Sequence, residues 1–263
     1  MCGICGFAGA GDFKDLEAMT HALVHRGPDD AGLWQDTPSP VFLGHRRLAV
    51  VDPIGGRQPM WTADGQLGVV YNGEIYNHLD LRRQLESEGH RFRSDHSDTE
   101  VLLHGYRQWG ENLPQRLNGM WAFAIYDRRR QILFLSRDRF GEKPLFYSRQ
   151  SGVFAFASEL TALIRHSRIG ADLCVPALKK YFAYGFIPAP HSLFTAIEKI
   201  PGGCNLTYDI RAERTRLKRY WRFALEPFER IPKDPEGAWG EELRRLLRQA
   251  VERRLMADVP LGF

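Results

Sequence analysis

The chain has 263 residues, of which 43% are hydrophobic, and a formal net charge of +4. This length and composition allow one large globular domain, or one domain with part of a second, and a sizeable core. No apolar run reaches the ~18 residues of a membrane helix, and the N-terminus lacks the regions of a signal peptide, so we predict a soluble, cytoplasmic protein that does not enter the membrane.

The charge and cysteine patterns argue against a nucleic-acid-binding protein and against a disulfide-rich secreted protein. All of the net positive charge lies after residue 210, where charges of both signs surround an amphipathic helical pattern. Such a pattern is typical of a solvated face or a domain interface, so we predict no nucleic-acid binding. Cysteines at positions 2, 5, 174 and 204 are too few and too scattered for the disulfide framework of a secreted protein.

Short β-type segments recur through the first two thirds of the chain. Turn residues separate these segments, and helical patterns lie between clusters of them. Clustered strands favour an α+β fold with mainly antiparallel sheets over a parallel, doubly wound sheet. We predict strands at 4–8, 41–51, 67–71, 121–126, 132–135 and 153–157, and helices at 16–24, 79–88, 99–109 and 159–166.

Several of the predicted strands are apolar at every position. The segment 121–126, Trp-Ala-Phe-Ala-Ile-Tyr, offers no polar face to water. A strand of this kind requires a sheet that is covered on both faces. Two stacked sheets flanked by helices meet this requirement, so we expect a layered architecture.

The last fifth of the chain differs in composition. Charged residues and prolines at 226–237 indicate a linker. After it, apolar residues recur at helical spacing over 239–255, with arginine and glutamate on the other face. Such a helix needs a partner surface. We predict a domain at 1–210, a connecting segment and linker at 211–235, and the first helix of an incomplete second domain at 236–263.

Cys2 is a candidate N-terminal nucleophile. The initiator methionine is commonly removed before a small second residue, which would leave a thiol and a free α-amine on Cys2. An α-amine titrates near ~8, so a useful fraction is neutral at neutral pH and can accept the thiol proton. Two alternatives stay open: Cys2 and Cys5 form a C-x-x-C redox or zinc motif, or Cys2 is an inert buried cysteine.

Residues 71–77, Tyr-Asn-Gly-Glu-Ile-Tyr-Asn, follow a predicted strand and offer donors for an oxyanion. Asn72 carries a side-chain amide, and Gly73 can present its backbone N–H with no Cβ in the way. Asn-Gly is also the strongest signal for a two-residue hairpin turn, and this alternative stays open.

Arg47 is a candidate to bind the α-carboxylate of a free amino acid. A pocket for such a ligand needs a guanidinium and a carboxylate at fixed positions. Alternation along the predicted strand places Arg47 on the face of Leu43 and Val51, where a charge needs a partner or a ligand. An arginine whose head group reaches solvent is the simpler alternative.

Asp98 is a candidate to bind the α-ammonium of the same ligand. It follows Ser97 in the string Ser-Asp-Thr-Glu, which has the S-x-x-E form of a capping box at the start of a helix. Its carboxylate would project from the first turn of that helix. Interaction with the helix dipole is the simpler alternative.

Taken together, these strings resemble the class II glutamine amidotransferase domain, and in detail that of the glutamine-hydrolysing asparagine synthetases. The resemblance covers nearly the whole chain, and several ordered matches are far more specific than one. The matching strings are MCGICG at 1–6, HRGPD at 25–29, GHRRL at 44–48, YNGEIYN at 71–77, SDTE at 97–100, RDRFGEKPL at 137–145, ASEL at 157–160 and YGFIP at 184–188.

The resemblance implies an N-terminal nucleophile hydrolase fold, a four-layer αββα sandwich of two mainly antiparallel sheets, followed by a C-terminal helix from an incomplete second domain. It implies that Cys2 attacks the side-chain amide of glutamine while Asn72 and Gly73 form the oxyanion hole. Glutamate and ammonia would be the products. The implied glutamine-binding residues are Arg47, Val50, Val51, Glu74, Ser97 and Asp98.

The resemblance also implies partners and a limit to the activity. Family members continue past the string DVPLG at 258–262 into a loop that binds ATP, and this chain stops before that loop. Glutamine hydrolysis would need no cofactor or metal, whereas ATP and Mg would be needed only in the missing synthetase domain. We expect glutaminase activity without asparagine synthesis, and a synthetase domain, a separate synthetase chain or a second copy as partner. The alternative is a non-catalytic fragment or binding module that associates with a separate synthetase chain.

Overall fold

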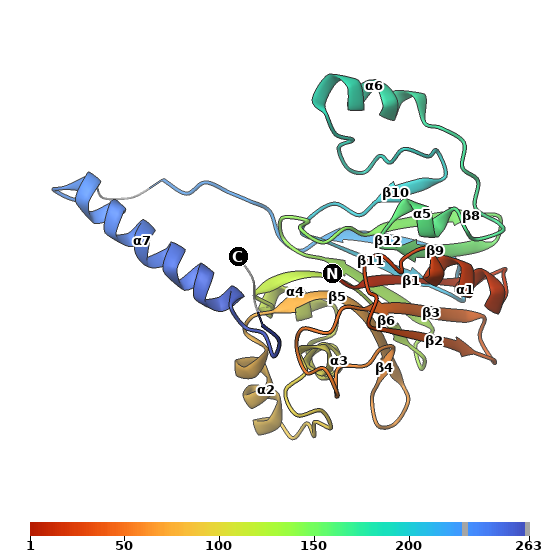
Figure 1. Cartoon of the computed structure of the whole chain (residues 1–263), viewed down its shortest axis with the longest axis horizontal. Helices are drawn as coiled ribbons and strands as arrows, with labels where there is room; N and C mark the ends of the chain where they lie inside the picture. The colour runs from red at the N-terminus through yellow and green to blue at the C-terminus, as the bar shows by residue number, and fades with distance from the viewer. Residues whose placement is uncertain (228–230, 261–263) are drawn as a thin grey trace.

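The strands form two antiparallel sheets of six strands each in a computed structural model that describes residues 1–227 and 231–260. The first sheet has the order β10 (Ile197–Lys199), β8 (Phe146–Gln150), β9 (Val153–Ala157), β1 (Gly3–Gly9), β3 (Val41–Arg47) and β2 (Asp30–Asp36). The second has the order β12 (Arg214–Arg219), β11 (Cys204–Asp209), β7 (Ile132–Arg137), β6 (Gly119–Asp127), β5 (Leu67–Ile75) and β4 (Met60–Trp61). The two sheets stack face to face (Figure 1).

Helices cover the outer faces of both sheets. Those against the first sheet are α1 (Phe13–His21) and α5 (Leu160–Leu163), and those against the second are α2 (His78–Ser87) and α3 (Asp98–Trp109). The other helices are the 3-10 helix η1 (Gly110–Asn112), α4 (Leu113–Arg116), α6 (Val175–Tyr184) and α7 (Pro235–Arg254). This arrangement confirms the predicted α+β fold, a four-layer αββα sandwich, and the additional C-terminal helix.

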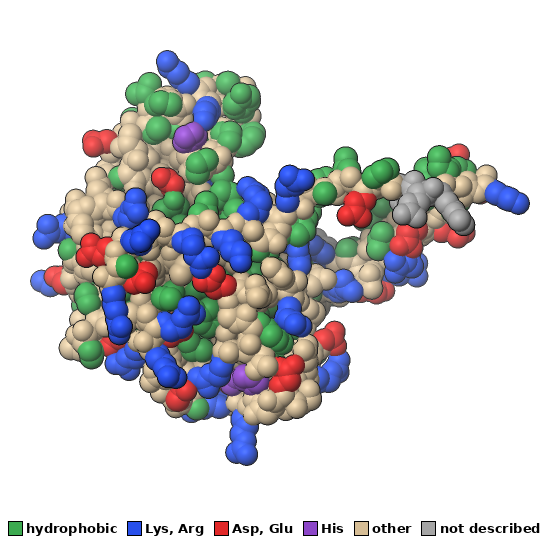
Figure 2. All heavy atoms as spheres, turned by 180° about the vertical axis from the view of Figure 1, so that it is seen from behind, with side chains coloured by type: hydrophobic (Ala, Val, Ile, Leu, Met, Phe, Trp, Pro, Cys, Tyr) green, Lys and Arg blue, Asp and Glu red, His purple; other side chains and the backbone are tan. Residues whose placement is uncertain are grey.

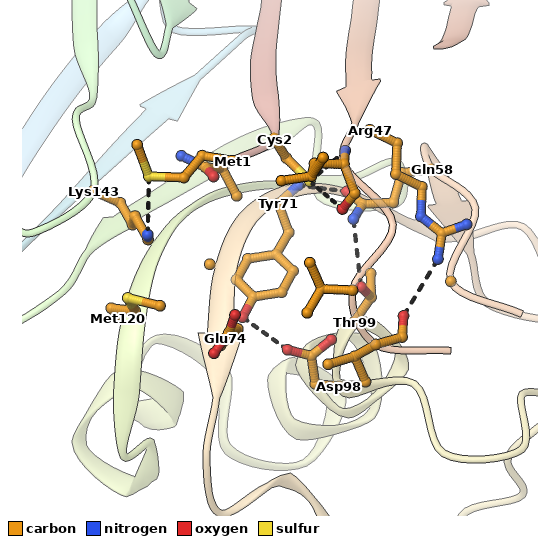
Figure 3. Close-up of a pocket in the computed structure, with 16 residues that line it drawn as sticks. Met1, Cys2, Arg47, Gln58, Tyr71, Glu74, Asp98, Thr99, Met120 and Lys143 are labelled. Carbon is orange, nitrogen blue, oxygen red and sulfur yellow. Dashed lines mark hydrogen bonds between the residues drawn. The ribbon is translucent and has the colours of Figure 1, made fainter. Parts of the chain in front are cut away.

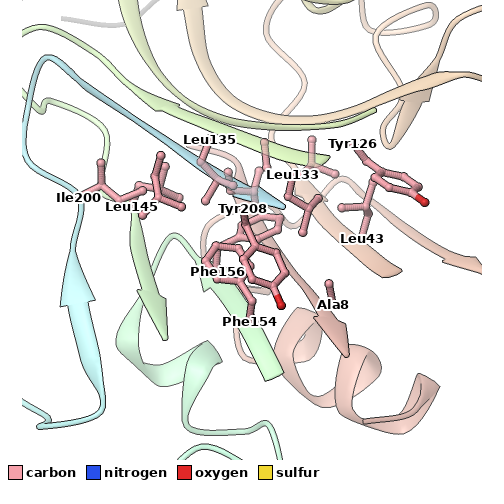
Figure 4. Packing of buried hydrophobic residues seen from close by; sticks show 14 of the residues in the cluster. Ala8, Leu43, Tyr126, Leu133, Leu135, Leu145, Phe154, Phe156, Ile200 and Tyr208 are labelled. Carbon is pink, nitrogen blue, oxygen red and sulfur yellow. The ribbon is translucent and has the colours of Figure 1, made fainter. Parts of the chain in front are cut away.

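Alternation along β6 explains how a strand can be apolar at every position. Ala122, Ala124 and Tyr126 face the first sheet and join the buried cluster between the two sheets (Figure 4). The side chains between them face α2 and α3, in a second buried cluster that includes Trp121, Phe123 and Ile125. Burial of each large apolar side chain stabilises the fold by about 1.5–3 kcal/mol. The prediction of a sheet covered on both faces is therefore confirmed.

Local capping sets where two of the helices begin. The Asp12 side chain accepts hydrogen bonds from the backbone N–H of Lys14 and Asp15, and the Asp15 side chain accepts one from the backbone of Asp12, which makes a capping box at α1. At α7, the Asp234 side chain accepts a hydrogen bond from Gly237 N at 3.1 Å. Each contact satisfies backbone donors that a helix N-terminus leaves unpaired.

Several predicted boundaries are wrong. β3 ends at Arg47 rather than at 51, β5 continues to Ile75, and the helix predicted at 159–166 has only the four residues of α5. Some elements were not predicted: β2, β4, β8, β10, β11, β12, η1, α4 and α6. β2 and β12 are edge strands with few large apolar residues, Leu33 and Trp34 in β2 and Leu217 in β12, so neither has the apolar run by which the central strands were predicted.

The C-terminal part projects from the sandwich. β12 lies within the predicted connecting segment and pairs with β11, whereas α7 starts far from the sheets and runs back so that its end lies beside the sandwich (Figure 1). No residue of α7 is buried, and its apolar side chains are exposed on the projecting arm seen in Figure 2: Trp239, Leu243, Leu246, Leu247 and Val251. Residues 228–230 of the predicted linker and 261–263 lie outside the described residues, and the division into domains stays a prediction.

Candidate active site

Three strand ends and one helix start meet at a single cavity (Figure 3). Cys2 directly precedes β1, Arg47 ends β3, Asn72 and Gly73 lie near the end of β5, and Asp98 begins α3. Since β1 and β3 are antiparallel neighbours with Gly3 opposite Arg46, the start of one lies beside the end of the other. The predicted site residues that line the cavity are Cys2, Arg47, Val50, Val51, Asn72, Gly73, Glu74 and Asp98.

Ser97 is the predicted site residue that does not line this cavity. It is the N-cap of α3, it is buried, and its Oγ has no hydrogen-bond partner among the described residues. Other lining residues were not predicted from the sequence: Met1, Leu48, Gly56, Gln58, Tyr71, Thr99, Met120 and Lys143. The string at 137–145 contained Lys143, but its charge pattern did not mark that residue as part of a pocket.

The sulfur of Cys2 lies beside the backbone of Leu48. Leu48 N–H donates to Cys2 Sγ at 3.4 Å, and the thiol reaches the Leu48 carbonyl oxygen at 3.6 Å. Burial raises the pKa of the Cys2 thiol, and the Leu48 contact opposes that rise. A thiol that stays protonated at neutral pH needs a base before it can act as a nucleophile.

Arg26 holds the backbone of Cys2. Its Nε donates to the Cys2 carbonyl oxygen at 2.9 Å, and its Nη1 pairs with Glu159 Oε1 at 2.8 Å. Glu159 is also 3.0 Å from Nε2 of His25. Residues from the strings at 25–29 and 157–160 are therefore in contact with each other, and one of them, Arg26, holds the backbone of Cys2 in place.

The C-x-x-C alternative does not fit this geometry. Cys5 is fully buried in β1, where its Sγ lies 3.2 Å from Thr20 Oγ1, whereas Cys2 faces the cavity. Burial raises the pKa of the Cys5 thiol to about 12, which makes it a poor nucleophile. All four cysteines are free, and the described part of the chain has no group of three or more metal-ligating side chains placed to hold an ion.

Arg47 is a buried cation that backbone oxygens hold in place. Its guanidinium donates to the carbonyl oxygens of Val51 at 3.3 Å, Asp52 at 2.7 Å and Pro53 at 2.6 Å. Within residues 1–227 and 231–260, no carboxylate pairs with it. The solvent-reaching alternative is wrong, because Arg47 is only 5% exposed. A buried, uncompensated guanidinium favours an anionic ligand.

One part of the strand prediction for Arg47 is wrong. Alternation along β3 does place Arg47 on the face of Leu43, which packs in the cluster between the sheets. Val51 lies beyond the end of the strand, however, in a loop that turns back so that its carbonyl oxygen meets the guanidinium. The contact is therefore with the loop backbone rather than with side chains on a shared strand face.

Asp98 is a buried carboxylate at the start of α3. Its Oδ2 accepts hydrogen bonds from Tyr71 OH at 2.9 Å and Ile75 N at 3.1 Å. Burial raises the pKa of Asp98, and these hydrogen bonds and His78 oppose that rise. The Asp98 carboxylate is therefore hydrogen-bonded to β5, and interaction with the dipole of α3 is not its only contact.

The predicted capping box at 97–100 is wrong. The Ser97 side chain makes no capping hydrogen bond. Glu100 instead accepts from the backbone N–H groups of Arg93 and Ser94 at 2.9 and 2.7 Å, and from Ser94 Oγ at 2.6 Å. The Glu100 carboxylate is thus bound by the loop before α3, and it is not available to accept a hydrogen bond from the Ser97 backbone, as a capping box requires.

Asn72 and Gly73 lie inside β5, which excludes the hairpin-turn alternative. Asn72 is 1% exposed, and its Nδ2 has no hydrogen-bond partner among the described residues. A buried amide donor without a partner is costly, and such groups often serve a ligand. A Cβ on Gly73 would lie 2.1 Å from the Met120 carbonyl oxygen, so the strand pairing leaves no room for a side chain.

Charged groups other than Arg47 and Asp98 also line the cavity. Burial, followed by the nearby Asp98 carboxylate, raises the pKa of Glu74. Burial lowers the pKa of Lys143, whose Nζ donates to Met1 Sδ at 3.2 Å. Burial also lowers the pKa of the N-terminal amine, which is that of Met1 in this structure. A lowered pKa leaves more of this amine neutral at pH 7.

The fold, and a cavity lined by all but one of the predicted site residues, are what the resemblance to glutamine amidotransferase domains predicts. Comparison with known families agrees, since the glutamine amidotransferase domain matches residues 1–221, and the chain belongs to this family, in its class II. A B. subtilis glutamine phosphoribosylpyrophosphate amidotransferase structure has a TM-score of 0.60 at 21% identity, over 84% of this chain and 49% of that one. At that identity the likeness shows the fold, and it confirms the predicted fold type.

Two relatives extend the similarity to the whole chain. Glutamine-hydrolyzing asparagine synthetase 3 of Bacillus subtilis is 39% identical over 272 residues, which cover 99% of this chain and 42% of that protein. Glutamine-hydrolyzing asparagine synthetase 1 of the same organism is 34% identical, over 100% of this chain and 41% of that protein. The chain thus spans less than half the length of these relatives. The resemblance to the amidotransferase part of asparagine synthetases is confirmed.

Proposed function

We propose that this protein hydrolyses L-glutamine to L-glutamate and ammonia, with Cys2 as the nucleophile once Met1 has been removed. One observation carries the proposal: a thiol, an unpaired amide donor, a buried guanidinium and a buried carboxylate line the same cavity. The residues that contribute these groups are Cys2, Asn72, Arg47 and Asp98. Each group matches one feature of glutamine or of its transition state.

The two charged residues would bind the amino-acid end of glutamine. Arg47 would bind the α-carboxylate, because its buried guanidinium has backbone oxygens as partners but no carboxylate among the described residues. Asp98 would bind the α-ammonium with the carboxylate that Tyr71 and Ile75 hold in position. The other predicted contacts are those of Val50, Val51 and Glu74, which line the cavity, and of Ser97, which does not.

The reaction would proceed through a thioester. The neutral α-amine of Cys2 accepts the thiol proton, and the sulfur attacks the side-chain carbonyl carbon of glutamine. Asn72 Nδ2 and Gly73 N–H donate to the oxyanion. The ammonium proton passes to the leaving nitrogen, ammonia departs, and the C–N bond is replaced by a C–S bond. Water then gives its proton to the amine, attacks the thioester, and releases glutamate and the thiol.

Free ammonia would then serve the formation of asparagine. This step is proposed because the similar relatives are named asparagine synthetases, and the chain spans only part of their length. Hydrolysis itself would need no cofactor, since the nucleophile, base and oxyanion donors are all protein groups. ATP and Mg would be required only for the amidation of aspartate, in a synthetase domain or chain.

Two measurements on the purified protein test the proposal. Intact mass should show that the N-terminal methionine is absent, and incubation with glutamine should release glutamate and ammonia in equal amounts. Cys2→Ala should abolish turnover. Cys5→Ala is the matched control, and it should retain turnover because Cys5 is buried away from the cavity. A processed Cys2 without any turnover would instead support the non-catalytic binding module.

A further inference from the structure

The segment that follows α7 returns to the wall of the cavity. Figure 1 shows α7 running back from a start far from the sheets to an end beside the sandwich, where the segment after it also lies. Asp258 N–H donates to the Val50 carbonyl oxygen at 2.9 Å, and Asp258 Oδ2 accepts from Asp52 N–H at 2.7 Å. These two hydrogen bonds lie on either side of Val51, a residue that lines the cavity.

The same loop holds Arg47. Asp52 and its neighbours Val51 and Pro53 supply the three carbonyl oxygens that accept from the guanidinium. Asp52 has a φ of 44°, in the left-handed region that residues other than glycine rarely adopt. Surrounding contacts help to hold this conformation, and the hydrogen bond from Asp52 N–H to Asp258 is one of them.

Asp258 also contacts the segment that leads into α3. Its Oδ2 lies 2.6 Å from His96 Nε2, while His96 Nδ1 lies 2.8 Å from Asp95 Oδ2. His96 is two residues before Asp98, in the segment that leads into α3. One carboxylate oxygen thus joins the loop that holds Arg47 to the segment that leads to Asp98.

A second contact fixes the end of α7 on the sandwich. The Arg254 guanidinium lies 5.0 Å from the centre of the Tyr76 ring, just beyond the end of β5. Arg254 is also close enough to Glu74 to oppose the rise in the pKa of that carboxyl group. The end of α7 and the segment after it therefore contact both the β5 side and the Arg47 side of the pocket.

We propose that Asp258 is a positioning residue for glutamine binding, which sets the spacing between Arg47 and Asp98 by joining the backbones that carry them. The inference rests on the proposed function, in which these two residues bind the two charged groups of one glutamine. Because Asp258 follows α7, a displacement of that segment would change the affinity for glutamine. The contact thus couples the glutamine pocket to the region beyond α7.

Steady-state kinetics with glutamine test the positioning role. Asp258→Ala should raise KM about tenfold, the effect of losing a hydrogen bond to a charged group, and should leave kcat within about twofold. Asp258→Asn should raise KM less, because an amide oxygen still accepts from Asp52 N–H. Glu242→Ala is the matched control: it removes an acidic side chain of α7 whose ion-pair partner, Arg245, lies on the same helix. It should change neither constant.

An unchanged KM in Asp258→Ala would overturn the proposal. So would an equal fall in kcat for Asp258→Ala and Glu242→Ala, since that would indicate a general effect on α7. Hydrogen exchange of the backbone amides of residues 50–56 tests the contact without turnover. Asp258→Ala should speed exchange there and Glu242→Ala should not, whereas unchanged exchange in both would overturn the inference. A wild-type protein that releases no glutamate would instead count against the proposed function.

Discussion

The unpaired side-chain amide of Asn72 permits a test that separates catalysis from stability. In Asn72→Ala the oxyanion loses one donor, and kcat should fall by about 10²–10³-fold, which corresponds to about 2.7–4 kcal/mol of transition-state stabilisation. KM should change little, because the donor would act mainly when the oxyanion forms. The assay is glutamate release under steady-state conditions, after intact mass has shown that the N-terminus is processed.

Stability should respond differently from activity. A buried amide without a partner costs about 1–3 kcal/mol, and Asn72 Nδ2 has no partner among the described residues. In Asn72→Ala, the stability gained by removing this unpaired donor should offset the stability lost with the side-chain contacts. The free energy of unfolding should therefore stay within about 1 kcal/mol of the wild-type value. Chemical denaturation with urea measures this quantity.

Asn205→Ala is the matched control for this substitution. Asn205 is also buried, at 2% exposed against 1% for Asn72, but it lies in β11 and does not line the cavity. Its Nδ2 donates to the Glu111 carbonyl oxygen at 3.3 Å, and its Oδ1 has no hydrogen-bond partner among the described residues. Truncation therefore removes one hydrogen bond and one unpaired acceptor away from the cavity, and it should leave kcat unchanged. A kcat for Asn72→Ala within about threefold of wild type would refute the oxyanion-hole assignment.

Three further predictions follow from the same contacts. Gly73→Ala places a Cβ 2.1 Å from the Met120 carbonyl oxygen, so it should destabilise the fold by about 1–3 kcal/mol and abolish turnover; an unchanged melting temperature would contradict this. Arg47→Lys leaves three N–H donors in place of five, so it cannot keep three carbonyl contacts and also bind a carboxylate, and KM for glutamine should rise about ten- to a hundredfold. Hydrogen bonds to Asp258 and Asp95 raise the pKa of His96 in the folded protein. The stability that the charged His96 contributes should therefore be fully present below its unfolded pKa, near ~6.5, and should be lost as the pH rises through its folded pKa. Unfolding of wild type and His96→Gln across this pH range measures the difference, which should shrink toward high pH; a difference that grows there would show the sign to be wrong.

The layered fold was largely readable from the sequence. The apolar string at 121–126 can be buried only in a sheet covered on both faces, and β6 is such a strand. Strand ends were less readable. The Asn-Gly pair at 72–73 is compatible with either a turn or a strand, and only pairing with β6 decides that β5 runs through it. Local propensity is weak at such positions, and cross-strand contacts override it.

The sequence also supplied most of the candidate residues of the site. A cysteine next to the initiator methionine, and an arginine and an aspartate in the matching strings, led to the prediction of a thiol nucleophile and a zwitterionic ligand, and the cavity brings these three residues together. The distances between these groups were not determined, because residues 2, 47, 72 and 98 come together only through the pairing of β1 with β3 and the stacking of the two sheets. Tertiary structure alone also brought Gln58 and Lys143 into the cavity and placed Asp258 on the loop that holds Arg47. Contacts between residues as far apart in sequence as 52 and 258 depend on how whole elements pack, and no local pattern of residues encodes them.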